Sequence, residues 1–261
     1  MDKNTLFQAV SNEPFIEPNQ LDASYELTQG IVNEYKNIMD VSSLSYKDVD
    51  AIYSMALSTD NVSLDERKNL IDLSALPTSS KNRLLSLLDK VIDNAYRGEY
   101  VNTVQDDDSN NDPAIGLFRK QFVSFSDMSD AEALEVVEFF TEVNKTKDYD
   151  VYRTADRYLK REFQSISIEE LSMVLHCLKP YAFPVIRMNN LTESTFSQFG
   201  VKLKNPESTK AYAANCKKIR DFRDANFGAV NFYVFYKAVN HDEDHVISHS
   251  LFKTDITAND F

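Results

Sequence analysis

Three Ser-x-x-Glu signatures, each followed by apolar residues at helical spacing, constrain the fold of this chain more than any other feature. They are the pairs Ser63/Glu66, Ser129/Glu132 and Ser167/Glu170. In such a capping box the serine side chain accepts a hydrogen bond from the third backbone N–H of a helix, and the glutamate accepts one from the backbone N–H of the serine. The chain also has only five glycines and no tryptophan among its 261 residues, whereas turn-dense all-β folds need many turn residues. The sequence therefore predicts a mainly α fold.

Helical spacing of apolar residues predicts two lobes. The first, residues 1–100, is acidic and contains four segments whose short connections predict a small helical bundle. These segments are residues 21–39, 45–57, 63–73 and 79–98. Residues 101–112, VNTVQDDDSNND, are polar and acidic, so we expect a linker there. Residues 113–240 predict a mixed, mostly helical lobe with one or two short extended segments, and residues 241–261 predict a polar tail.

The net charge of −13 is distributed unevenly. Residues 1–112 carry 9 basic and 20 acidic groups, whereas residues 113–240 carry 18 and 16. A nucleic-acid surface is basic, because much of its affinity comes from neutralising phosphates. The acidic lobe is therefore excluded as such a surface.

Membrane insertion and secretion are not expected from this sequence. No apolar run approaches the roughly 20 residues that cross a bilayer, and the N-terminus lacks the basic start and apolar core of a secretory signal. The two cysteines, Cys177 and Cys216, lie far apart and do not form a disulfide framework. We expect a cytoplasmic protein that does not contact a membrane.

Residues 206–235 predict a basic amphipathic helix that ends at Gly228 and is followed by a short apolar segment. Asn205 is the candidate N-cap, and Pro206 suits the first helical position, where its missing N–H costs nothing. The apolar face that follows consists of Tyr212, Cys216, Ile219 and Phe222. Gly228 follows this run as a stop signal. After it, the alternating aromatic and β-branched residues of 230–236 predict a short buried strand or extended segment.

Two pieces of sequence in this half resemble a known family. They are LKPYAFPVI, which begins at Leu178, and CKKIRDFRDANF, which begins at Cys216. Together they resemble a region that precedes the AAA+ GTPase module of McrB-type proteins, in systems that cut modified DNA, and the resemblance covers roughly residues 171–239. The chain contains no G-x-x-x-x-G-K-[ST] phosphate loop, so the nucleotide chemistry of that family is absent from it. The resemblance implies a targeting region without its motor, or a stand-alone relative.

The basic residues between positions 202 and 223 form the candidate DNA-binding site. They are Lys202, Lys204, Lys210, Lys217, Lys218, Arg220 and Arg223. Under the functional interpretation they face DNA phosphates. Under the alternative they form a solvated helix face, with Asp221 and Asp224 as local partners. Nearby aromatic residues are more typical of a core than of a platform for stacked bases.

The sequence offers a metal-binding alternative in its tail. His241, His245 and His249 are spaced by four residues and would share one helix face, as zinc ligands can. The zincin pattern, however, has glutamate directly after the first histidine, where this chain has Asp242. The aspartates of residues 106–112 lack the central glycine and terminal glutamate of a calcium loop. We therefore predict no metal and no cofactor.

The sequence also predicts no catalytic residues. Cys177 follows His176 directly, and neighbouring side chains on a helix point about 100° apart, so they do not form a nucleophile–base pair. The acidic cluster near residue 130 follows the polar face of one predicted helix and does not resemble a nuclease site. Its members are Asp127, Asp130, Glu132, Glu135, Glu138 and Glu142.

The leading functional hypothesis follows from the resemblance. It is a non-enzymatic targeting or adaptor region of an McrB-like restriction system in antiviral defence. Such a region would contact DNA or a neighbouring subunit, either an AAA+ GTPase module or a nuclease. The alternative follows from the charge of residues 1–112 and is an acidic protein-binding module, such as an immunity or anti-defence factor, that does not bind nucleic acid.

Overall fold

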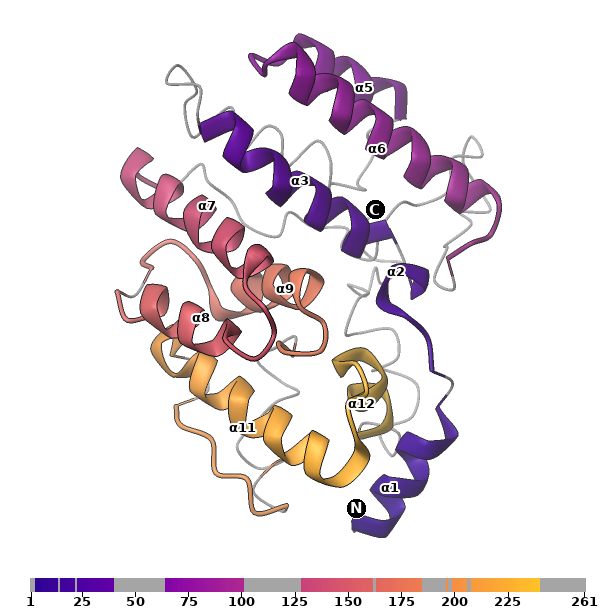
Figure 1. The fold of residues 1–261 in the computed structure, drawn as a ribbon, viewed down its shortest axis with the longest axis vertical. Helices are drawn as coiled ribbons and strands as arrows, with labels where there is room; N and C mark the ends of the chain where they lie inside the picture. The colour runs from indigo at the N-terminus through magenta and orange to yellow at the C-terminus, as the bar shows by residue number, and fades with distance from the viewer. Residues whose placement is uncertain are drawn as a thin grey trace, which may run out of the picture. The chain divides into compact units, whose positions relative to one another are not determined.

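The computed structural model describes residues 3–13, 15–21, 23–39, 64–100, 128–161, 163–184, 196, 199–205 and 208–239 (Figure 1). The regular structure in these ranges is helical and includes no strand, so the prediction of a mainly α fold is confirmed. None of the described helices is long and apolar enough to cross a membrane.

The helices are named as in Figure 1. They are α1 (Lys3–Asn12), α2 (Pro18–Leu21), α3 (Ala23–Met39), α5 (Leu64–Leu73), α6 (Thr78–Tyr96), α7 (Asp130–Lys145), α8 (Val151–Leu159), α9 (Ile168–Leu178), α11 (Thr209–Phe227) and α12 (Phe232–Val239). The predicted helix at 45–57, the linker at 101–112 and the polar tail lie outside the described residues.

The contacts between residues divide the chain into two units. Unit 1 consists of Met1–Glu17, Lys147–Glu162 and Ser167–Phe261, and unit 2 consists of Pro18–Thr146 and Phe163–Ile166. Unit 1 therefore contains α1, α8, α9, α11 and α12. In unit 2, α3 packs against both α6 and α7. The boundaries expected from charge, at residues 101–112 and 241, lie outside the described residues and stay a prediction.

The two capping signatures that can be followed have different outcomes. At α9, the Ser167 hydroxyl accepts from the backbone N–H of Glu170, and the Glu170 carboxylate accepts from that of Ser167, so the full capping box is confirmed. At α7, Ser129 caps the helix as predicted. The Glu132 carboxylate, however, accepts hydrogen bonds from Ser165 and the neighbouring backbone. This carboxylate holds Phe163–Ile166 within unit 2.

The helix predicted from residue 206 begins later than expected. Its first residue is Thr209, and Ser208 occupies the N-cap position without a side-chain hydrogen bond. Asn205 is therefore not the N-cap of α11. The end of the helix is as predicted, because Gly228 has φ 75°, a left-handed conformation that glycine adopts without steric cost.

The prediction of a short buried strand or extended segment at 230–236 is wrong from residue 232 on, because Phe232–Val239 forms α12. The Asn231 side-chain oxygen accepts from the backbone N–H of Val234 at 3.0 Å, which is an N-cap interaction. Phe232, Val234 and Phe235 are all buried. Since both faces of this short run are apolar, its periodicity does not distinguish a strand from a buried helix. The asparagine before the run was the signal for a helix.

Gly30 lets α3 and α6 approach closely in unit 2. A Cβ atom built at Gly30 would lie 2.1 Å from Cδ2 of Leu87 on α6. Tyr25, Ile31 and Val32 of α3 are also buried. At Gly30, α3 has no side chain that would hold Leu87 of α6 away.

Glu34 on α3 forms an ion pair with Arg83 on α6. Arg83 donates through Nε and Nη2 to the two carboxylate oxygens at 2.6 and 2.8 Å, and Asn37 donates at 3.1 Å. Glu34 is buried, whereas half of the Arg83 side chain is exposed. Burial acts to raise the pKa of Glu34, but these hydrogen bonds and the charge of Arg83 outweigh it and hold the pKa below its ordinary value of 4.5.

Replacing the carboxylate should destabilise unit 2. We expect Glu34→Gln to lower the free energy of unfolding by about 1–3 kcal/mol at pH 7, because the neutral amide offers Arg83 one acceptor oxygen where the buried carboxylate offers two. Glu34 binds protons less readily in the folded than in the unfolded chain, so its stabilisation is present above pH 4.5 and is lost as the pH falls through the lowered pKa. Urea titration of both proteins at pH 7 and below pH 4 measures the difference.

Glu26→Gln is the matched control. Glu26 on α3 pairs with Lys90 on α6, but the Lys90 side chain is 60% exposed, and such pairs contribute little. The prediction would be contradicted if both variants lost equal free energy of unfolding. It would also be contradicted if the loss for Glu34→Gln stayed the same at acid pH, where the carboxylate is protonated.

Candidate functional site

Residues 180–184, here called the carbonyl segment, form a hydrogen-bond centre in unit 1. Each of its five consecutive backbone carbonyls accepts a hydrogen bond from a donor elsewhere in the unit. The donors are the Phe232 backbone N–H to Pro180 (2.9 Å), Arg223 Nη1 to Tyr181 (2.9 Å), the Tyr152 hydroxyl to Ala182 (2.5 Å), His176 Nδ1 to Phe183 (2.7 Å) and the Tyr212 hydroxyl to Pro184 (2.8 Å). These donors belong to α8, α9, α11 and α12, so the carbonyl segment joins four helices.

The local sequence explains why these carbonyls need partners. Pro180 follows α9 and has no N–H with which to continue the helix. Beyond it the chain is not helical, so the carbonyls lack the N–H partners of a helical turn. Ala182, Phe183 and Pro184 are buried, and a buried carbonyl without a partner costs about 1–3 kcal/mol. Side chains from the surrounding helices provide the missing donors.

Burial keeps two donors of this centre, His176 and Tyr152, neutral. Burial lowers the pKa of His176 to about 4, although the hydrogen bond to Phe183 acts in the opposite direction. The imidazole is therefore neutral at pH 7, with its proton on Nδ1. Burial also raises the pKa of the Tyr152 hydroxyl and of the Cys216 thiol. A buried thiol that stays protonated is a poor nucleophile, in agreement with the expectation that Cys216 fills the core.

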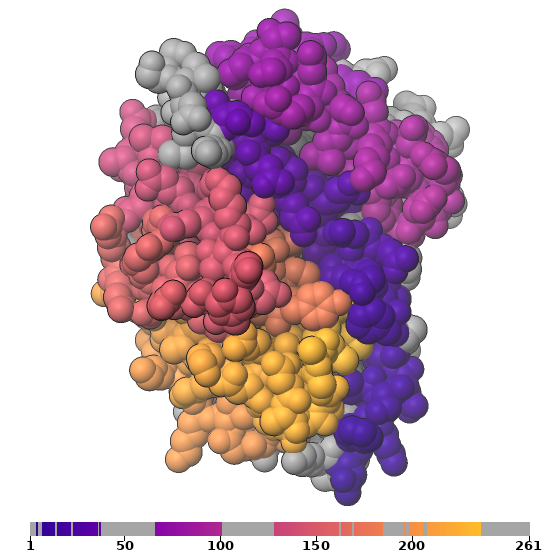
Figure 2. Space-filling model, viewed as in Figure 1, coloured from indigo at the N-terminus to yellow at the C-terminus, as the bar shows by residue number. Residues whose placement is uncertain are grey.

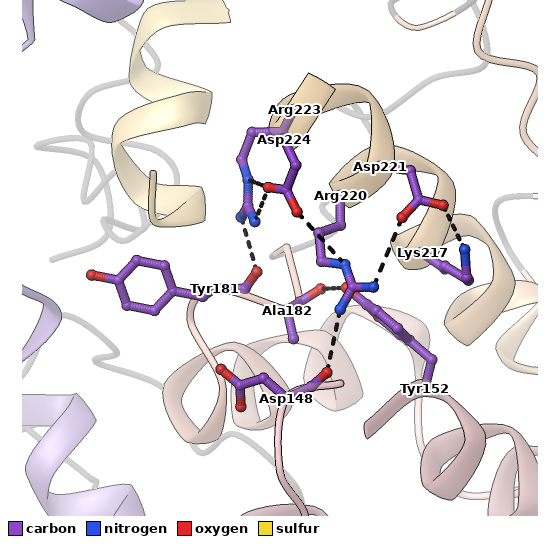
Figure 3. A network of polar contacts seen from close by, with 9 residues as sticks. All are labelled: Asp148, Tyr152, Tyr181, Ala182, Lys217, Arg220, Asp221, Arg223 and Asp224. Carbon is purple, nitrogen blue, oxygen red and sulfur yellow. Dashed lines mark hydrogen bonds and ion pairs between the residues drawn. The ribbon is translucent and has the colours of Figure 1, made fainter. Parts of the chain in front are cut away.

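Arg223, one of the predicted DNA-binding residues, is buried in the same centre (Figure 3). Its guanidinium donates to the Tyr181 carbonyl and, through Nε and Nη2, to one carboxylate oxygen of Asp224 at 2.9 and 2.7 Å. The guanidinium carbon lies 4.3 Å from the centre of the Phe232 ring. The structure thus places Arg223 within the fold, whereas the predicted lysines are exposed fully or in part.

Arg220 lies one turn earlier and is four-fifths buried. It donates to the backbone carbonyl of Asp148 at 3.2 Å, and its guanidinium carbon lies 4.5 Å from the centre of the Tyr152 ring. Asp221 and Asp224 lie 3.8 and 4.0 Å away (Figure 3). Arg220 therefore links α11 to the turn before α8.

The five predicted lysines lie on the surface, fully or in part. Lys218 donates to the backbone carbonyl of Lys202, and Lys217 pairs with Asp221 at 2.5 Å. The Lys204 backbone forms two hydrogen bonds of 2.8 Å with the Asn215 side chain, which leaves the Lys204 side chain exposed. Lys210 is also exposed. The structure therefore divides the predicted site into surface lysines and internal arginines.

The described structure does not assemble the candidate metal-binding and nucleophilic residues into a site. The tail histidines, Asp127 and the aspartates of residues 106–112 lie outside the described residues. Within the described part of the chain, no group of three His, Cys, Asp or Glu residues is arranged to hold a metal. Cys177 and Cys216 are buried free thiols. Sequence reasoning missed the donors Tyr152 and His176, since nothing in the sequence shows which carbonyl a tyrosine or histidine will meet.

The two units differ strongly in charge. Unit 2 holds 11 basic and 23 acidic residues, a net charge of −12, whereas unit 1 holds 17 and 18, a net charge of −1. Helix α7 contributes five acidic residues and one lysine to unit 2. Asp130 and Glu138 are exposed on it, and the Leu134 side chain between them is 47% exposed. This face of α7 combines negative charge with an accessible apolar group.

No protein-family model matches this sequence, and comparison with curated proteins and with solved structures finds no similar protein. The resemblance to McrB-type proteins therefore stays a prediction.

The tyrosine hydroxyls of the carbonyl segment should stabilise the fold. We expect Tyr152→Phe and Tyr212→Phe each to lower the free energy of unfolding by about 1–3 kcal/mol, because each leaves a buried carbonyl without its donor. Chemical denaturation followed by far-UV circular dichroism measures this.

Tyr149→Phe is the control three residues from Tyr152. Its side chain is 73% exposed, so we expect a change within about 0.5 kcal/mol. If all three variants behaved alike, the carbonyl segment would not depend on these hydroxyls.

Proposed function

We propose that this chain is a non-enzymatic adaptor module that binds a basic protein partner through unit 2. The observation that carries this proposal is the charge difference between the units, −12 against −1. A surface with such an excess of one charge attracts partners of opposite charge and repels polyanions. Nucleic acid is therefore a poor partner for unit 2.

Helix α7 is the contact surface that we propose. Protein interfaces place apolar groups at their centre and charged groups around them. On α7, Leu134 is the exposed apolar group, with Asp130 and Glu138 one turn before and after it. In the family that the two motifs resemble, the partner would be an AAA+ GTPase module or a nuclease subunit.

DNA contact by unit 1 is the second candidate. It is favoured by the exposed side chains of Lys202, Lys204, Lys210 and Lys217, together with the resemblance to McrB-type proteins. Arg220 and Arg223 weaken it, because their guanidinium groups are engaged inside the unit. The protein-binding proposal is therefore the better supported of the two.

Binding should depend on the α7 face. A partner would first be identified by co-purification with the tagged chain, and then titrated in purified form at several salt concentrations. We expect Asp130→Asn/Glu138→Gln to weaken its binding about tenfold and to reduce the salt dependence.

Asp89→Asn/Asp93→Asn on α6 is the matched control. It removes the same charge from unit 2, but at positions paired with Lys68 and Arg97. Equal effects of the two variants would show that only total charge matters. An acidic partner would contradict the proposal.

A gel-shift titration tests the second candidate. It uses modified and unmodified DNA duplexes at low salt, with the chain and with its Lys202/Lys204/Lys210/Lys217→Ala variant. The arginines are left intact because they serve the fold. We expect no shift for either protein. A shift that the four substitutions abolish would favour DNA contact and contradict a protein-only role.

A further inference from the structure

Three arginines and a tyrosine form one stripe along α8 in unit 1. Tyr149, Arg153, Arg157 and Arg161 follow one another at intervals of four residues, and side chains at this spacing lie on one face of a helix. Lys160, which ends α8, keeps helical backbone angles, so Arg161 continues the row. All four residues are exposed, with 73% of Tyr149 and 84% of the Arg153 side chain accessible to solvent. They are here called the α8 stripe.

The opposite face of α8 fixes the stripe in position. Tyr152, Ala155 and Leu159 are buried, and α8 packs against α11. Figure 2 shows both helices at the surface of the molecule. The Tyr152 hydroxyl donates to the carbonyl segment, and Arg220 on α11 donates to the turn before α8. A partner that binds the stripe therefore finds its backbone already ordered, which lowers the cost of binding.

The stripe is locally basic, although acidic residues lie among its cations. Each of the three carboxylates beside it is paired with a cation of unit 1. The pairs are Asp150–Arg153 (3.1 Å), Asp156–Lys160 (2.9 Å) and Asp148–Lys179 (3.4 Å). Residues 147–161 hold five basic and three acidic residues, a net charge of +2. This part of unit 1 therefore attracts negative charge.

We propose that the α8 stripe docks an acidic helix of a partner protein. Each guanidinium can donate two parallel hydrogen bonds to one carboxylate. A partner helix with acidic side chains four residues apart presents them at the interval of the arginines. Tyrosine and arginine are also the residues that most often carry the binding energy of a protein interface. The stripe goes beyond the contact proposed for α7, because it adds the second surface through which an adaptor joins two partners.

The carboxylates among the arginines favour a protein over a nucleic acid. Phosphates are closely and evenly spaced along a nucleic acid, so a strand along α8 would bring some of them against Asp150 and Asp156. A protein helix can place its carboxylates opposite the arginines and other side chains opposite the aspartates. The charge pattern of the stripe thus fits an acidic helix better than a uniform polyanion.

An anisotropy titration of the full chain tests the docking. The probe is a fluorescein-labelled, alanine-rich helical peptide of about 20 residues with glutamate at every fourth position, and a second probe has glutamine at these positions. At physiological salt we expect the glutamate probe to bind, and the glutamine probe to bind about tenfold more weakly. Arg153→Gln/Arg157→Gln/Arg161→Gln should weaken binding of the glutamate probe about tenfold, and Tyr149→Ala about threefold.

Lys202→Gln/Lys204→Gln/Lys210→Gln is the matched control, because it removes the same charge from exposed positions of unit 1. We expect it to weaken binding about twofold at most, since salt screens distant charges. Far-UV circular dichroism checks that each variant is folded. Asp130→Asn/Glu138→Gln should leave probe binding unchanged, so the result at α8 is separate from the result at α7.

Three outcomes would overturn the proposal. They are no binding of the glutamate probe, equal weakening by the two triple variants, and displacement of the probe by duplex DNA of equal length at a lower concentration than by unlabelled probe. The last outcome would assign the stripe to nucleic acid.

Discussion

The need to pair the five carbonyls of residues 180–184 determines much of unit 1. A chain that turns out of α9 at a proline and remains buried must find donors outside its own backbone. It finds them in an arginine, two tyrosines, a histidine and the first N–H of α12. Helices that are distant in sequence are thereby fixed around one short segment.

This arrangement also connects the two motifs that suggested a family. LKPYAFPVI provides the carbonyls, and CKKIRDFRDANF provides Arg223, whose guanidinium spans from Tyr181 to Asp224. The two motifs therefore contact each other and stabilise the same part of unit 1. The residues that resemble McrB-type proteins serve to hold unit 1 together, and the binding surface that we propose for a basic partner lies on α7.

Helix capping and apolar periodicity predicted the structure correctly where a short-range interaction determines where a helix begins or which face is buried. Ser129 and Ser167 begin α7 and α9 as the capping rule requires, and the apolar stripe of α3 is buried. The rules failed at α12, because a run that is buried on both faces has no informative period and Asn231 decided the outcome. They also could not separate Arg223 from Lys217. The sequence does not show whether a charged side chain faces water or a buried carbonyl. Only packing between residues distant in sequence decides between these two environments.

Hydrogen exchange of the Arg223→Ala protein tests the role of the carbonyl segment most directly. Loss of the guanidinium removes the partner of the Tyr181 carbonyl and the contact with Phe232. The predicted result is faster exchange in α8, α9, α11 and α12 together, with unchanged exchange in α3 and α6, which belong to unit 2. Faster exchange confined to the last turn of α11 would contradict a segment that holds the four helices in common.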